Sequence, residues 1–99
     1  MLYLLIYDFV DDYLERRTAL RPEHLALCRQ AVARGEMLAG GAVGNPPESG
    51  LLLFQGVAEH AEKFAVADPY VTRGLVTRWQ VKPWTTVAGI EVLASNTSL

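Results

Sequence analysis

Apolar and polar positions alternate or cluster along the chain in patterns that predict four strands. Leu2–Tyr7 is apolar at every position, which predicts a strand covered on both faces. Met37–Val43 and Leu51–Phe54 predict two further strands, and residues 44–50 between them are rich in glycine and proline, which predicts an elongated hairpin loop. Residues 75–82 alternate between apolar and polar, which predicts a last strand with one polar face.

After this last strand, apolar and polar residues follow a less regular pattern. Pro83 is expected to end or bend the strand, because proline cannot donate to a ladder hydrogen bond. Ile90–Leu93 predicts a short extra strand, and Ala94–Leu99 predicts a flexible tail.

Two stretches between the strands have helical spacing. Asp11 or Asp12 is expected to cap a helical turn, which Pro22 interrupts or restarts before the helix runs to about Arg34 and stops at Gly35. The second helix has one apolar face, made by Val57, Ala61, Phe64 and Ala65.

His60 lies off that apolar face, beside Lys63, and is therefore expected to face solvent.

The order of these elements predicts an α+β fold. A β-α-β-β-α-β order is typical of a ferredoxin-like sandwich, in which two helices cover one face of a four-stranded antiparallel sheet. We expect residues 1–99 to form a single domain of this kind. The apolar strand Leu2–Tyr7, together with Trp79, offers more apolar surface than one layer of helices can cover. A second copy of the chain on the open sheet face is therefore expected, which predicts a homodimer.

A histidine lies on the inner face of the first predicted helix. Counting from His24, the positions three, four and seven residues later are Leu27, Cys28 and Ala31, a stripe that faces the protein body and makes Cys28 a small core residue. Pro22 suits the first turn of a helix, which places His24 near the positive end of the helix dipole. We therefore expect a neutral imidazole that can accept a proton, with a core histidine bonded to a backbone carbonyl as the structural alternative.

The inner face of the second helix continues onto a carboxylate. Asp68 follows Ala65 by three residues, and its burial is costly without a partner. It also precedes Pro69, a combination typical of an N-cap before a short turn, which Gly74 then closes. The two roles are compatible, because two helices on one side of a sheet can bring His24 and Asp68 together. Asp68 would then fix the imidazole tautomer and support its positive charge.

Composition narrows the classes of function. The 99 residues are 51% hydrophobic and carry a formal charge of −2, which is typical of a folded protein and argues against a general nucleic-acid binder. Two histidines and one cysteine provide no zinc-type ligand spacing and no internal disulfide. The leading apolar run is too short to span a membrane and lacks the features of a signal peptide, so a cytoplasmic protein is expected. Three clustered arginines are enough for an anion site: Arg16, Arg17 and Arg21.

Short motifs spread over nearly the whole chain resemble the YciI-like (YCII-related) family of small proteins. Their order and spacing make the match fairly specific. The shared pieces are Leu2–Tyr7, Arg17, Arg21-Pro22-Glu23-His24-Leu25, Gly35, Leu38-Ala39-Gly40-Gly41, Ala67-Asp68-Pro69-Tyr70, Gly74 and Val81-Lys82-Pro83-Trp84.

This resemblance implies a ferredoxin-like fold that pairs into a dimeric α/β barrel. It also implies that His24 and Asp68 match the family's proposed active-site pair. One related member is a dehydrochlorinase of a chlorinated hydroxyquinol, and the wider group includes muconolactone isomerases and monooxygenases that use no cofactor. Cofactor-free proton transfer on a small aromatic or lactone-like molecule is the implied chemistry. The chain departs from the family at Gly41, where many members have proline, and in its short Asn45-Pro46-Pro47 loop.

Three functions remain compatible with these residues. The first is a lyase, isomerase or dehalogenase with His24 and Asp68 as acid/base pair and no metal or cofactor. Its substrate contacts would come from Arg17, Arg21, Gly41, Tyr70 and Trp84. The second is a non-catalytic module that binds a small ligand, and the third is an accessory domain for a protein partner.

Overall fold

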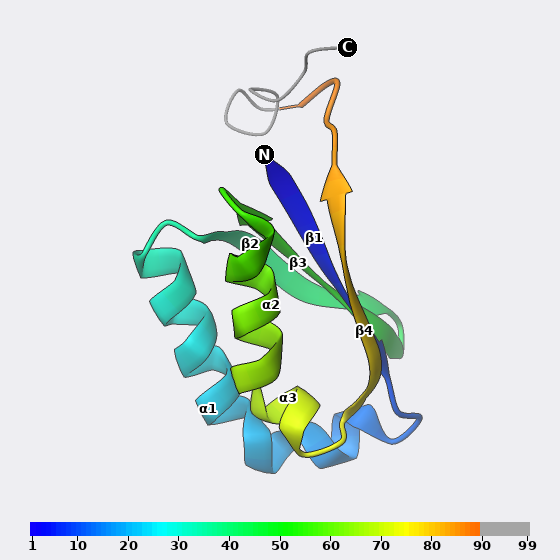
Figure 1. The fold of residues 1–99 in the computed structure, drawn as a ribbon. Coiled ribbons are helices and arrows are strands. Elements are labelled where there is room, and N and C mark those ends of the chain that lie inside the picture. The colour runs from blue at the N-terminus through cyan, green and yellow to red at the C-terminus, as the bar shows by residue number, and fades with distance from the viewer. Residues whose placement is uncertain (90–99) are drawn as a thin grey trace.

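Four antiparallel strands form one sheet in the order β2-β3-β1-β4 in the computed structural model, which describes residues 1–89. Figure 1 shows both long helices on the same side of this sheet. The α+β sandwich predicted from the sequence is therefore confirmed. The elements are β1 (Leu2–Phe9), α1 (Tyr13–Ala33), β2 (Met37–Gly44), β3 (Pro47–Gln55), α2 (Ala58–Ala67), α3 (Pro69–Thr72) and β4 (Val76–Trp84). The extra strand and the tail predicted for Ile90–Leu93 and Ala94–Leu99 lie outside the described residues.

The core lies between the helices and the central strand β1. Leu5 and Tyr7 of β1 are buried under the helices with Phe54 and Leu75, while Leu4 and Ile6 alternate onto the open face and stay half-buried. Trp79 was expected to add to the uncovered apolar surface, and this expectation is wrong. It pairs with Tyr7 across β1 and β4, so it lies on the same side as Tyr7 and packs against the core.

The hairpin between β2 and β3 is tighter than predicted. The two strands continue to Gly44 and from Pro47, so only Asn45 and Pro46 separate them instead of an elongated loop over residues 44–50. Gly44 has a φ of +105°, and a Cβ there would lie 2.8 Å from the Pro46 carbonyl oxygen. Glycine therefore permits a close turn where the composition alone predicted an open one.

Strand β4 also runs further than expected. It continues through Pro83 to Trp84, with Pro83 opposite Tyr3. β4 is an edge strand of the sheet, and an edge position tolerates the missing N–H of proline because that side has no neighbouring strand.

Helix α1 is continuous, so Pro22 neither starts nor interrupts it. The helix begins at Tyr13, and Pro22 lies inside it on the exposed side, where the carbonyl that loses its donor can bond to water. His24 consequently lies near the middle of α1, away from the helix terminus where the dipole would act.

None of the helices in residues 1–89 is both long enough and apolar enough to cross a lipid bilayer.

Candidate active site

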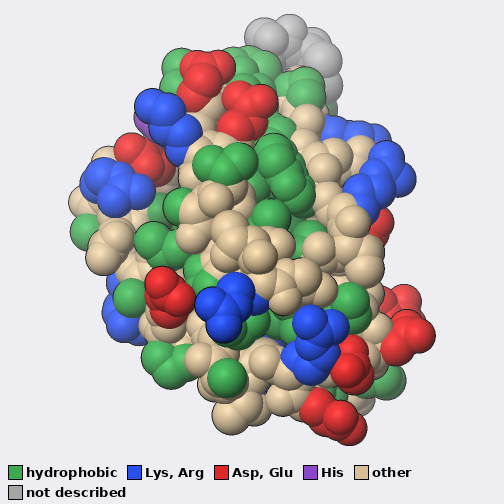
Figure 2. All heavy atoms as spheres, turned by 60° about the horizontal axis from the view of Figure 1, so that its bottom comes forward, with side chains coloured by type: hydrophobic (Ala, Val, Ile, Leu, Met, Phe, Trp, Pro, Cys, Tyr) green, Lys and Arg blue, Asp and Glu red, His purple; other side chains and the backbone are tan. Residues whose placement is uncertain are grey.

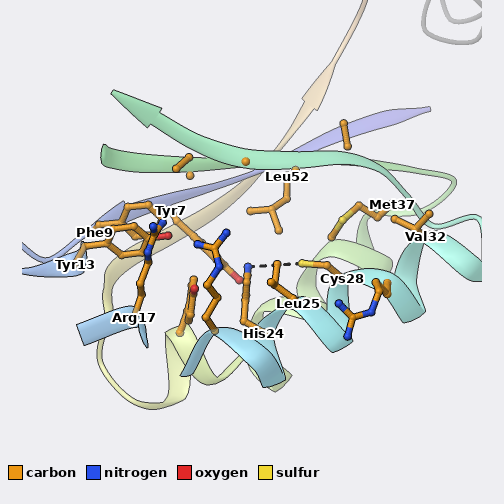
Figure 3. Close-up of a pocket in the computed structure, with 18 of the residues that line it drawn as sticks. Tyr7, Phe9, Tyr13, Arg17, His24, Leu25, Cys28, Val32, Met37 and Leu52 are labelled. Atoms are coloured by element: carbon orange, nitrogen blue, oxygen red, sulfur yellow. Dashed lines mark hydrogen bonds between the residues drawn. The ribbon is translucent and has the colours of Figure 1, made fainter. Parts of the chain in front are cut away.

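A cavity of about 530 Å³ separates the middle of α1 from the sheet. Only Tyr13 and Ala31 are buried in this 21-residue helix, so α1 packs closely near its two ends and stands off the sheet between them. Most α1 side chains that line the space recur at helical spacing on one face: Arg17, Arg21, His24, Leu25, Cys28 and Val32, together with Tyr13, Arg29 and Ala33. Figure 3 shows His24 and Leu25 in the middle of this row, below Leu52 of the sheet. One part of the inner face of α1 is therefore the wall of a cavity, while Leu20, Leu27 and Ala31 belong to the core or pack against it.

Asp68, at the junction of α2 and α3, connects the other residues of the site by hydrogen bonds. Its side chain is completely buried, yet its two oxygens accept hydrogen bonds from three donors. The Tyr7 hydroxyl donates to Oδ2 at 2.8 Å, the Tyr70 backbone N–H donates to Oδ1 at 3.0 Å, and His24 Nδ1 lies 2.8 Å from Oδ1 and 3.0 Å from Oδ2. The bond to Tyr70 makes Asp68 the N-cap of α3. The cap and the contact with His24 therefore coexist in one carboxylate.

The ring of His24 is held on its faces as well as at Nδ1. It stacks on the Tyr70 ring at 3.8 Å between centroids with 4° between the planes, and Phe64 meets it edge-on at 6.2 Å. The side chain retains 13% exposure, toward the cavity. Asp68 and Tyr70 thus fix the position and the orientation of the ring.

The electrostatic environment of His24 favours its charged form. Burial opposes protonation, but the hydrogen bond to Asp68, the contact with Cys28 and the associated charges outweigh it and raise the pKa of His24 from 6.5 to about 9. The neutral imidazole expected from the sequence is therefore corrected to an imidazolium at neutral pH. The reason is that a buried carboxylate at 2.8 Å outweighs burial, and His24 does not lie at the helix terminus that the prediction assumed.

The second ring nitrogen of His24 faces a thiol. Nε2 lies 3.6 Å from Cys28 Sγ, one helical turn further along α1. Cys28 was expected to be a small core residue, and it does pack against the core, but it is only half-buried and also lines the cavity. Because Nδ1 is committed to Asp68, Nε2 is the nitrogen that can exchange a proton with a molecule in the cavity.

Two tyrosines keep their hydroxyl protons at this site. Burial and Asp68 raise the pKa of the Tyr7 phenol well above its ordinary value of 10, so Tyr7 acts as a hydrogen-bond donor to the carboxylate. Burial, with the neighbouring Tyr13, also raises the pKa of Tyr70, although the charges of Arg21 and Arg17 oppose this shift. Both side chains are neutral donors at neutral pH.

The structure brings together most of the residues that the sequence suggested. Arg17, Arg21, Gly41 and Tyr70 all line the same cavity as His24, with Asp68 directly behind the histidine. Trp84 does not line it, because it lies at the far end of β4 opposite Leu2 and is 40% exposed. Arg16 also points elsewhere, to Asp12 and the Arg73 carbonyl.

His60 was expected to face solvent, and the structure corrects this. Its side chain is half-buried over Gly56, with Nδ1 3.1 Å from the Gln55 carbonyl oxygen and Nε2 3.7 Å from Glu36. Gly56 has a φ of +99° and no side chain, which leaves room for the imidazole against the backbone.

Tyr7 is the site residue that the sequence analysis missed. It was interpreted only as part of an apolar strand, although it shares the core-facing side of β1 with Leu5. A tyrosine on a buried strand face needs a partner for its hydroxyl, and this requirement was the available signal. Phe9 and Tyr13 were missed for a different reason. Their stacking at 3.8 Å joins two elements and has no local sequence signature.

No group of three or more His, Cys, Asp or Glu side chains within residues 1–89 lies close enough together to hold a metal ion.

Comparison with known proteins places the chain in a family. Residues 1–85 match the family model for the YCII-related domain. The chain belongs to the YCII-related family. Protein YciI of Escherichia coli O6:H1 is 32% identical over 94 residues, which cover 85% of this chain and 96% of that protein. An uncharacterized Haemophilus influenzae protein matches with the same identity and coverage.

Solved structures support the fold of this YCII-related protein. The 5-chloro-2-hydroxyhydroquinone dehydrochlorinase TftG from Burkholderia phenoliruptrix, in complex with 2,5-dihydroxybenzoquinone, superposes with a TM-score of 0.69 at 20% identity. The match covers 85% of this chain and 93% of TftG. Protein Atu4242 from Agrobacterium tumefaciens gives a TM-score of 0.52 at 16% identity, covering 83% and 89% of the two chains. At these identities the likeness concerns the fold.

Proposed function

We propose that this YCII-related protein is a cofactor-independent enzyme of the lyase, isomerase or dehalogenase type. His24 would exchange a proton with a small organic substrate through Nε2, and Asp68 would hold the ring and stabilise its charge. Arg17, Arg21, Gly41 and Tyr70 would contact the substrate. The observation that carries the proposal is a completely buried carboxylate bonded to a histidine that lines an open cavity, with its other ring nitrogen beside the Cys28 thiol.

The raised pKa of His24 determines how such an enzyme would work at neutral pH. With a pKa of about 9 the resting ring is protonated, so His24 first acts as a general acid and donates from Nε2. A reaction that begins with proton abstraction would use the small neutral fraction of His24. Its rate would then rise with pH up to about 9.

The alternative is a binding module without turnover on the same fold. In that case the contact between His24 and Asp68 would only order α3 against α1. The N-cap bond from Tyr70 to Asp68 favours this second function, because it gives the carboxylate a structural role that is independent of any reaction.

Turnover separates the two functions. The protein is incubated with 5-chloro-2-hydroxyhydroquinone and with a panel of enolisable ketones and lactones in deuterated water. Chloride release and deuterium incorporation are then followed. The enzyme proposal expects at least one reaction that is lost in His24→Gln, whose neutral amide cannot relay a proton. Binding of 2,5-dihydroxybenzoquinone without any His24-dependent reaction would instead support the binding module.

We also propose that the protein is a homodimer through the open sheet face. This proposal is supported by a shallow apolar groove on that face, between Leu4, Leu51 and Leu53, next to the exposed Val43. A patch of this kind is costly to leave in water, and a second copy of the same face would cover it symmetrically.

Sedimentation equilibrium at micromolar concentration is expected to give the mass of a dimer. Leu51→Lys places a charge in the groove and should yield a folded monomer, because Leu51 is already 39% exposed within one chain. Val66→Lys, on the outer side of α2 and 62% exposed, is the matched control and should remain dimeric. A monomeric unmodified protein would contradict the proposal.

A further inference from the structure

Three guanidinium groups reach the cavity without a carboxylate partner. Arg17, Arg21 and Arg29 all line it, and within residues 1–89 none of them forms a salt bridge with Asp or Glu. Within residues 1–89 no acidic side chain lines the cavity, since Asp68 is completely buried behind His24 and its oxygens are occupied by three donors. The lining therefore carries positive charge that nothing in the described chain neutralises.

This positive charge is local to the cavity. The chain as a whole has a formal charge of −2. Figure 2 shows basic and acidic side chains interspersed over the face that it presents, and not gathered into one basic surface. A general attraction for polyanions would need a broad basic face, so the charge in the cavity points to a small anion.

The two ends of the cavity differ in character. Figure 3 shows Arg17 beside Tyr7, Phe9 and Tyr13 at one end, and Val32 with Met37 at the other. The Arg17 guanidinium lies 5.5 Å from the centroid of the Tyr13 ring, which itself stacks on Phe9. Arg21 belongs to the same end, because its charge acts on the Tyr70 phenol together with that of Arg17.

Flat surfaces dominate the charged end. The rings of Phe9 and Tyr13 are parallel within 8°, and those of Tyr70 and His24 are parallel within 4°. Tyr13 meets Tyr70 edge-on at 5.9 Å, so the two stacks are joined. Such walls favour a planar ligand, which gains contact area on rings without distorting its own shape.

We propose that the cavity selects a planar organic monoanion, such as an aromatic carboxylate or an enolate. Its anionic oxygens would lie at Arg17 and Arg21, its ring beside His24, and its uncharged end between Val32 and Met37. This assignment rests on the proposed function for the role of His24. It deepens that function by naming the substrate class and the orientation in which the substrate would bind. The arginine fork suits a carboxylate or enolate oxygen pair, and an uncharged isostere would leave both guanidinium groups unpaired.

Cys28 provides a built-in probe of this selectivity. It is the only cysteine in the chain, and its thiol lines the cavity next to His24. Alkylation by iodoacetate, an anion, is compared with alkylation by iodoacetamide, its neutral analogue. The ratio of the two rates is measured in the folded protein and in the urea-unfolded chain. Because both reagents attack the same thiolate, the ratio cancels the thiolate fraction and reports the charge preference of the cavity.

The ratio of the iodoacetate rate to the iodoacetamide rate is expected to be about tenfold higher in the folded protein than in the unfolded chain. One or two unpaired cations near the Cys28 thiol would attract the anionic reagent by about this much. Arg17→Gln and Arg21→Gln should each reduce this preference, and the double variant should reduce it further, leaving the part that Arg29 and the protonated His24 contribute beside Cys28. Arg73→Gln removes the same charge outside the cavity and should leave the preference intact. Benzoate should also protect Cys28 at lower concentrations than benzamide.

A folded ratio equal to or below the unfolded ratio would overturn the proposal. So would a preference that is undiminished in the Arg17→Gln/Arg21→Gln variant, since the charge that selects the anion would then not come from these two arginines. These results are independent of turnover. A protein that prefers the anionic reagent but shows no His24-dependent proton transfer would retain the ligand class and lose only the proposed reaction.

Discussion

Replacing Asp68 with asparagine is expected to lower the pKa of His24 from about 9 to near or below its ordinary value of 6.5. Asparagine can still cap α3 and can still accept a hydrogen bond, so the local backbone should persist. What disappears is the negative charge at 2.8 Å, which leaves burial to dominate and to disfavour the imidazolium. The titration of the His24 ring, followed by NMR in both proteins, measures the change.

Two comparisons make this result specific. Asp12→Asn removes an exposed carboxylate from the first turn region, where it pairs with Arg16, and should leave the His24 titration unchanged. Tyr7→Phe should act in the opposite direction to Asp68→Asn. It removes one donor from the carboxylate and keeps the buried ring, so Asp68 interacts more strongly with the imidazolium and the pKa of His24 should rise. An unchanged His24 pKa in Asp68→Asn would reduce Asp68 to a helix cap.

The free energy of unfolding is expected to decrease as the pH rises from 6.5 through about 9. Folding raises the pKa of His24, so its contribution is fully present below the unfolded value of 6.5, where both states are protonated. It is lost as the folded ring deprotonates near 9. The His24 side chain is only 13% exposed, so this pKa shift corresponds to a loss in the free energy of unfolding on the order of 3 kcal/mol.

Urea unfolding across this pH range measures the effect as the difference in the free energy of unfolding between the unmodified protein and His24→Gln. The difference cancels the contributions of other titrating groups, and it should diminish as the pH rises. His60→Gln is the matched control, because it removes a histidine at the junction of β3 and α2 and leaves the contact between His24 and Asp68 in place. Parallel pH profiles for the unmodified protein and His24→Gln would show that His24 does not gain its proton affinity on folding.

The sequence predicted the sheet and helices because their signals are local. Continuous apolar positions marked β1, and the spacing of Ala61, Phe64 and Ala65 marked the buried face of α2. The errors arose at proline and glycine. Pro22 and Pro83 were assigned to element ends, although an exposed helix face and a sheet edge accommodate them inside their elements.

His24 and Asp68 could be predicted from the sequence, but Tyr7 and the electrostatics of the site could not. The inward positions of His24 and Asp68 follow from helical periodicity, and their meeting follows from two helices on one sheet face. The charge state of His24 depends on a distance of 2.8 Å between segments 44 residues apart, which no local pattern encodes. The same limit applies to Cys28. The apolar stripe of α1 predicted a core, and Leu27 and Ala31 do pack there, but Cys28 also borders the cavity between the helix and the sheet.

In the unmodified protein, Asp68 is expected to hold His24 as a protonated, exchangeable acid at the open cavity. The titration midpoint of the His24 ring in the unmodified protein tests it most directly, with the His60→Gln variant used to assign the two histidine signals. A midpoint near 9 is expected. A midpoint at or below 6.5 would mean that burial outweighs Asp68, and would contradict both the general-acid role and the fall in stability toward alkaline pH.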